Sequence, residues 1–190
     1  RIAEHPDVLL PCMATLDGFI LSHTVEPVEM LPDEQARKFV GDYKARRSLL
    51  DVDRPWTFGP LDLQNYYFEH KRQQVEAMKN ASAVIEAVGK EYGELSGRPY
   101  GFFESHKLDD AEYVLIALGS TAGTVATAVD ELRGRGVKAG MLKLRVFRPF
   151  PGERIIEAIR HAKVVGVLDR SVSFGLGGEY GGHAAALDGT

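Results

Sequence analysis

The chain has 190 residues, of which 44% are hydrophobic and 26% charged, a composition that excludes a predominantly disordered protein. Lys and Arg number 23 against 27 Asp and Glu, so the formal net charge is −4 and binding to nucleic acid is disfavoured. No apolar run approaches the roughly 20 residues of a membrane-spanning helix, and no secretory leader opens the chain. We therefore expect a cytoplasmic protein that binds neither nucleic acid nor membrane.

A single cysteine, Cys12, excludes an internal disulfide and a site built from several thiolates, such as a zinc or iron–sulfur site. The six histidines are scattered, and none is paired at the spacing that makes a metal-binding helix face. The chain begins at Arg1 and stops at Thr190 shortly after a glycine cluster, so we expect it to be a piece of a longer polypeptide.

The first thirty residues are predicted to be extended. Residues 8–14 and 19–21 are strand-like, and Asp17-Gly18 is typical of a turn between them. Asp33 is a candidate N-cap for a short helix that runs through Val40. The stretch 41–60, spaced by prolines and a glycine, is predicted to be an irregular arm or connector.

One long amphipathic helix is predicted over residues 64–95. Its apolar positions follow three-then-four spacing at Val75, Met78, Ser82, Ile85, Gly89 and Tyr92, widened by Ala81, Val84 and Val88. Such a stripe favours core or interface packing over a cofactor groove. Gly97 and Pro99 end the helix, and residues 100–105 are a further candidate strand.

Residues 110–190 predict an α/β domain. Strand-like runs at 113–118, 139–146 and 164–168 alternate with two amphipathic helices. This alternation predicts a parallel sheet with flanking helices, whose ligands or partners meet the carboxyl ends of the strands.

The two helices of this domain carry start and stop signals. Ser120 or Thr121 can cap the first, and Gly134 or Gly136 can end it. Pro151 fits the first position of the second helix. The predicted inner faces are Val125, Ala128, Val129 and Leu132 in the first helix and Ile155, Ala158, Ile159 and Ala162 in the second.

Two glycine-bearing loops follow the predicted strands. The loop 119–124 opens a helix and could hold an anion on its backbone N–H groups, but it lacks the lysine and the spacing of a P-loop, so an ordinary strand-to-helix turn is favoured. The loop 174–182 departs from the dinucleotide fingerprint at Tyr180, so a close approach to a neighbouring domain or subunit is favoured there.

Other candidate groups are weaker. Arg148 could clamp a carboxylate or phosphate, although an inter-domain salt bridge is favoured. Asp17 and His23 could form an acid–base pair, but six residues of separation do not establish proximity. We therefore expect no catalytic, cofactor-binding or metal-binding residue in this chain.

Four motifs in chain order resemble the alpha subunit of pyruvate:ferredoxin oxidoreductase and its 2-oxoacid relatives. They are residues 16–23 (LDGFILSH), 119–124 (GSTAGT), 144–151 (LRVFRPFP) and 167–175 (VLDRSVSFG). The resemblance implies the end of a thiamine-pyrimidine-type domain at 1–30, a connector with the long helix at 31–109, and a truncated transketolase C-terminal-like α/β domain at 110–190.

The resemblance also implies an activity for the whole complex. Such enzymes decarboxylate a 2-oxoacid, here expected to be pyruvate, on thiamine diphosphate, and they form acetyl-CoA and CO2 while [4Fe-4S] clusters pass electrons to ferredoxin. Thiamine diphosphate, Mg2+, the clusters and coenzyme A are expected in the complex, with none bound by this chain alone. Beta-, gamma- and delta-type subunits or domains and ferredoxin are the expected partners.

Within this resemblance the candidate residues are interface residues. They are Asp17, Gly18, Phe19, Ser22 and His23 at an inter-domain junction, Arg148 and Phe150 at a strand end, and Asp169, Arg170, Gly175, Gly177 and Gly178 in the last loop. The family pattern is broken at Glu179-Tyr180, where a proline-containing turn is expected. Two alternatives stay open: a stand-alone nucleotide- or anion-binding module, and a transketolase or pyruvate dehydrogenase-type component that uses no ferredoxin.

Overall fold

The computed structural model describes residues 1–169 and 184–186. The chain divides into two compact units. Unit 1 comprises Arg1–Met13 and Pro27–Pro99, and unit 2 comprises Ala14–Glu26 and Tyr100–Thr190. Each unit is described below by itself.

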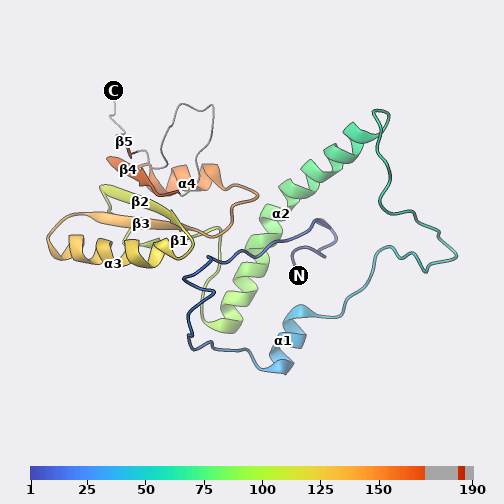
Figure 1. Cartoon of the computed structure of the whole chain (residues 1–190), viewed down its shortest axis with the longest axis horizontal. Helices are drawn as coiled ribbons and strands as arrows, with labels where there is room; N and C mark the ends of the chain where they lie inside the picture. Colours follow the sequence, from blue (N-terminus) through green and yellow to red (C-terminus); the bar gives the residue numbers. More distant parts are fainter. Residues whose placement is uncertain (170–183, 187–190) are drawn as a thin grey trace. The chain divides into compact units, whose positions relative to one another are not determined.

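Unit 1 is built on two helices, α1 (Asp33–Val40) and α2 (Tyr67–Ser96) (Figure 1). Both predicted helices are confirmed. Pro32 rather than Asp33 is the N-cap of α1. Asp33 lies in the first turn, where its negative charge interacts favourably with the free backbone N–H groups at the start of the helix. Gly97 ends α2 with a φ of 70°, a left-handed conformation that glycine adopts without steric cost.

The small core of unit 1 lies between α2 and the N-terminal segment. Val8 is buried against Ala81 and Val84. Two polar contacts also join the N-terminal segment to α2. Arg1 forms an ion pair with Glu91, and Asn80 donates a hydrogen bond to the backbone carbonyl of Asp7 at 3.2 Å. The predicted apolar stripe is therefore buried only at its centre. Val75 lies beyond these contacts and is exposed.

The strands predicted at 8–14 and 19–21 are wrong. Both stretches are turns or irregular backbone, because Leu9 (φ 48°) and Phe19 (φ 64°) adopt left-handed conformations that interrupt an extended chain. Local hydrogen bonds take the place of a sheet ladder: Val8 N–H donates to the His5 carbonyl at 2.9 Å, and His23 N–H donates to the Phe19 carbonyl at 3.2 Å. Apolar alternation alone could not distinguish these turns from strands.

Unit 2 contains a five-stranded sheet in the order β1-β3-β2-β4-β5. The strands are β1 (Phe103–His106), β2 (Tyr113–Leu118), β3 (Ala139–Leu144), β4 (Val164–Val167) and β5 (Ala184–Ala186). The three predicted central strands are parallel, with Tyr113 opposite both Ala139 and Val164. The two edge strands are antiparallel to their neighbours, so the sheet as a whole is mixed. The α/β class is confirmed, and residues 103–106 confirm the candidate strand before it.

Two helices, α3 (Thr121–Gly134) and α4 (Gly152–Ile159), cover opposite faces of this sheet (Figure 1). Adjacent residues of β3 point to opposite faces, so Met141 packs in the cluster with α3 and Leu142 in the cluster with α4. The predicted inner faces are confirmed at Val125, Val129 and Ile155. Ala162 is buried as well, but it lies after the end of α4 and is not part of the helix. Ala128 is exposed instead, and Ala122 and Ala126 pack inward in α3.

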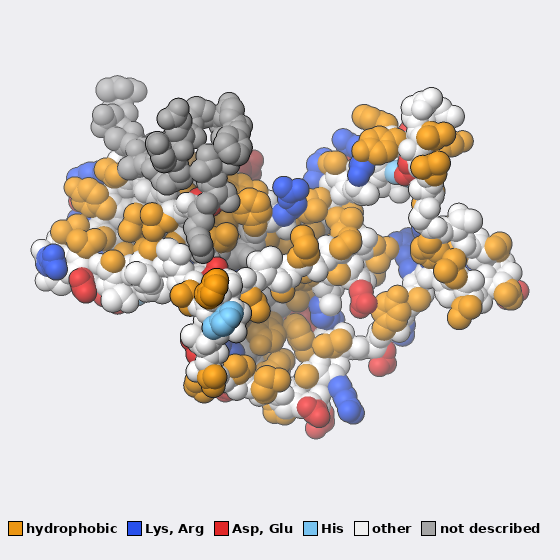
Figure 2. Space-filling model, viewed as in Figure 1, with side chains coloured by type: hydrophobic (Ala, Val, Ile, Leu, Met, Phe, Trp, Pro, Cys, Tyr) orange, Lys and Arg blue, Asp and Glu red, His pale blue; other side chains and the backbone are white. Residues whose placement is uncertain are grey.

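Hydrophobic side chains remain exposed in both units (Figure 2). Among the described helices, none combines the length and the apolar character that a bilayer crossing requires.

The side chain of Arg133 links α3 to the first residue of β3 and to the segment that follows β1. Its guanidinium donates to both carboxylate oxygens of Asp110 at 2.7 and 3.0 Å and to the backbone carbonyls of Lys107 and Ala139 at 2.7 and 2.6 Å. The hydrogen bond and charge of Arg133 lower the pKa of Asp110 below its ordinary value of 3.8.

This pair predicts a pH dependence of stability. A carboxyl whose pKa is lowered on folding stabilises the fold above its unfolded pKa, and that contribution is lost as the pH falls through the folded pKa. We expect the melting temperature of Arg133→Gln to fall less steeply than that of the parent as the pH drops below about 4. An equally steep acid transition in the variant and the parent would contradict this assignment.

A second prediction concerns Gly140 in β3. A Cβ there would lie 2.6 Å from the Lys107 carbonyl oxygen and 2.7 Å from Ala111 Cβ. We expect Gly140→Ala to lower the free energy of unfolding by about 1–3 kcal/mol because the backbone must shift. Gly123→Ala is the control, since nothing lies within 4 Å of its new Cβ. Thermal or urea unfolding measures both, and equal stability of the two variants would refute the close packing at Gly140.

Candidate interface at the carboxyl ends of the parallel strands

The three parallel strands bring their carboxyl ends to one edge of the sheet. Leu118 of β2 lies opposite Leu144 of β3, and Val167 of β4 lies opposite Ile116. The segments that follow these strands therefore emerge at the same edge. They contain the predicted interface residues Arg148, Phe150 and Asp169.

The side chain of Asp17 contacts the start of α3 at this edge of the sheet. Its carboxylate accepts a hydrogen bond from the backbone N–H of Ser120, the N-cap of α3, which makes no side-chain cap of its own. A negative charge at a helix N-terminus satisfies a free donor and interacts favourably with the helix dipole. The loop predicted as a possible anion site is thus occupied by a carboxylate of the chain itself.

Gly119 fits this contact for two reasons. Its φ of 65° lies in the left-handed region, which disfavours other residues. A Cβ at this position would also lie 2.7 Å from both carboxylate oxygens of Asp17. Gly119, which belongs to the possible anion-binding loop 119–124, is therefore required for the contact between Asp17 and Ser120.

Residues 18–24 form a turn held by short-range contacts. Phe19 N–H donates to Ser22 Oγ at 2.9 Å, and Ser22 Oγ lies 2.7 Å from His23 Nδ1. The rings of Phe19 and His23 are stacked, with centroids 5.1 Å apart. Asp17 and His23 thus each have a structural partner, which is the Ser120 N–H for Asp17 and Ser22 Oγ for His23.

Arg148 and Phe150 follow β3 on the surface. Phe147 and Phe150 pack edge to face with ring centroids 6.0 Å apart, and both are more than half exposed. Arg148 is also exposed, and among the described residues it forms no ion pair. Asp169 lies directly after β4, whose continuation is fixed by a hydrogen bond from Leu168 N–H to the Ile116 carbonyl at 2.9 Å. Arg170, Gly175, Gly177, Gly178 and the departure at Glu179-Tyr180 lie outside the described residues.

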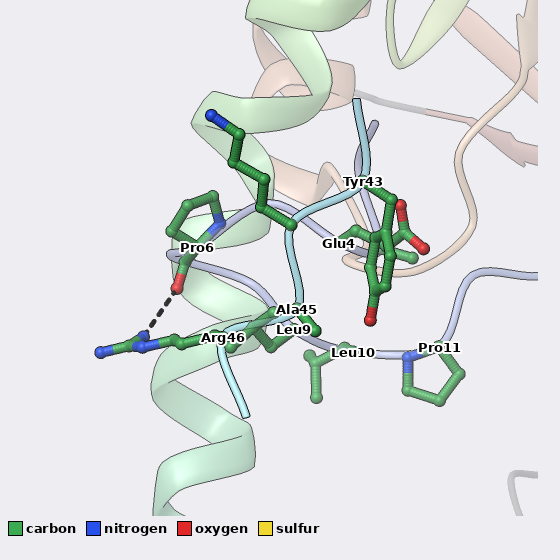
Figure 3. Close-up of a pocket in the computed structure, with 10 residues that line it drawn as sticks. Glu4, Pro6, Leu9, Leu10, Pro11, Tyr43, Ala45 and Arg46 are labelled. Carbon is green, nitrogen blue, oxygen red and sulfur yellow. Dashed lines mark hydrogen bonds between the residues drawn. The ribbon is translucent and has the colours of Figure 1, made fainter. Parts of the chain in front are cut away.

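Unit 1 holds a cavity of about 640 Å3 that the sequence did not reveal (Figure 3). Its lining is Ala3, Glu4, Pro6, Leu9, Leu10, Pro11, Tyr43, Lys44, Ala45 and Arg46. Arg46 donates to the Pro6 carbonyl at 3.4 Å across it. The lining contains no serine, cysteine or histidine.

Within the part of the chain that the structure describes, no three His, Cys, Asp or Glu side chains come together as a metal site.

Comparison with known proteins identifies relatives for nearly the whole chain. Residues 1–90 match the family described as pyruvate flavodoxin/ferredoxin oxidoreductase, thiamine diP-binding. Residues 111–187 match the pyruvate:ferredoxin oxidoreductase core domain II.

Curated relatives agree with these families. The chain is 57% identical to pyruvate synthase subunit PorA of Thermotoga maritima over 92% of this chain and 45% of the relative. It is 41% identical to ketoisovalerate oxidoreductase subunit VorA of Pyrococcus horikoshii over 92% of this chain and 44% of the relative. The chain thus spans about half the length of the curated relatives it matches. A solved 2-oxoglutarate:ferredoxin oxidoreductase from Magnetococcus marinus is 18% identical, with a TM-score of 0.42 over 60% of this chain and 17% of that one.

The contact between Asp17 and Ser120 yields a testable prediction. We expect Asp17→Ala to accelerate amide hydrogen exchange in residues 14–26 and at the start of α3 by about tenfold or more, because a charge-assisted hydrogen bond is lost. Asp109→Ala is the control, since Asp109 is exposed and precedes the same domain core. Unchanged exchange in the Asp17 variant would contradict the contact.

Proposed function

The chain belongs to the pyruvate:ferredoxin oxidoreductase family, and from this premise we propose that it forms part of the alpha subunit of a 2-oxoacid:ferredoxin oxidoreductase. The 57% identity to a pyruvate synthase subunit is the strongest support. The proposed reaction is oxidative decarboxylation of pyruvate to acetyl-CoA and CO2, with electrons passed to ferredoxin.

The cofactors of this reaction belong to the proposed complex. They are thiamine diphosphate, Mg2+, [4Fe-4S] clusters and coenzyme A, and beta-, gamma- and delta-type subunits and ferredoxin are the proposed cytoplasmic partners. We assign no cofactor contact to the described residues of this chain.

We assign this segment a structural role, which is to position the surfaces that meet around the reaction centre. The residues at the carboxyl edge of unit 2 support this role. Asp17, Ser22 and His23 make structural contacts, while Phe19, Phe147 and Phe150 are exposed. An exposed aromatic set of this kind is suited to burial against a partner.

The alternative of an anion-binding module is weakened by one observation. The backbone donor at Ser120 already binds the Asp17 carboxylate, so an external phosphate would have to displace a tethered anion. The alternative of a transketolase-type component without ferredoxin is disfavoured because both matched families are ferredoxin oxidoreductases.

The proposal predicts the activity of the native assembly that contains this chain. Purified anaerobically, the assembly should reduce a viologen dye only when both pyruvate and coenzyme A are present, and it should contain iron and thiamine diphosphate. We expect kcat/KM for pyruvate to exceed that for ketoisovalerate by at least about tenfold, because a pocket shaped for a methyl group excludes a branched chain.

Omission of coenzyme A is the matched control for this assay. An assembly that holds thiamine diphosphate but no iron would contradict the ferredoxin-dependent reaction. A preference for ketoisovalerate would retain the enzyme class and correct the substrate.

A further inference from the structure

We draw no further inference here: the strongest candidate, the cavity of unit 1 that is lined by residues of the segments 3–11 and 43–46, carries nothing because its side chains are largely exposed and nothing in the described part of the chain shows what occupies or covers it.

Discussion

The candidate interface depends on one electrostatic contact, between the carboxylate of Asp17 and the N-terminal end of α3. It joins residues 103 positions apart in the sequence and satisfies a helix donor that has no cap of its own. It also explains why Gly119 is a glycine, because the left-handed backbone and the space taken by the carboxylate both exclude a side chain. The turn that presents Phe19 and His23 begins at this contact.

The sheet supplies the other half of the arrangement. Because β3, β2 and β4 are parallel, the segments after them emerge together, and the exposed Phe147 and Phe150 lie in one of these segments. Buried apolar side chains on both faces of the sheet hold the strands in register. Met141 packs on the face covered by α3, and Leu142 packs on the face covered by α4. The interface residues can therefore remain at the surface without contributing to the core.

Periodicity predicted the parts of the fold that bury a continuous face. The parallel strands, α2, α3 and α4 follow from apolar spacing, and the left-handed Gly136 after α3 follows from its position. The turns at 8–9 and 18–24 could not be predicted in this way, because the same apolar residues suit a strand and the decisive factors are local φ values and polar contacts. Asp17 was singled out as a junction residue, but its partner at Ser120 is a backbone N–H that leaves no signature in the sequence. The cavity of unit 1 was missed for a similar reason, since its lining comes from two segments without a shared motif.

The most direct test of this account is the amide resonance of Ser120, followed by heteronuclear NMR together with the side-chain carboxyl carbon of Asp17 as the pH is lowered. The account predicts that both resonances titrate with one midpoint and that the Ser120 amide shift loses this pH dependence in Asp17→Asn. A Ser120 amide that is insensitive to pH in the parent, or that titrates unchanged in Asp17→Asn, would contradict the contact on which the interface depends.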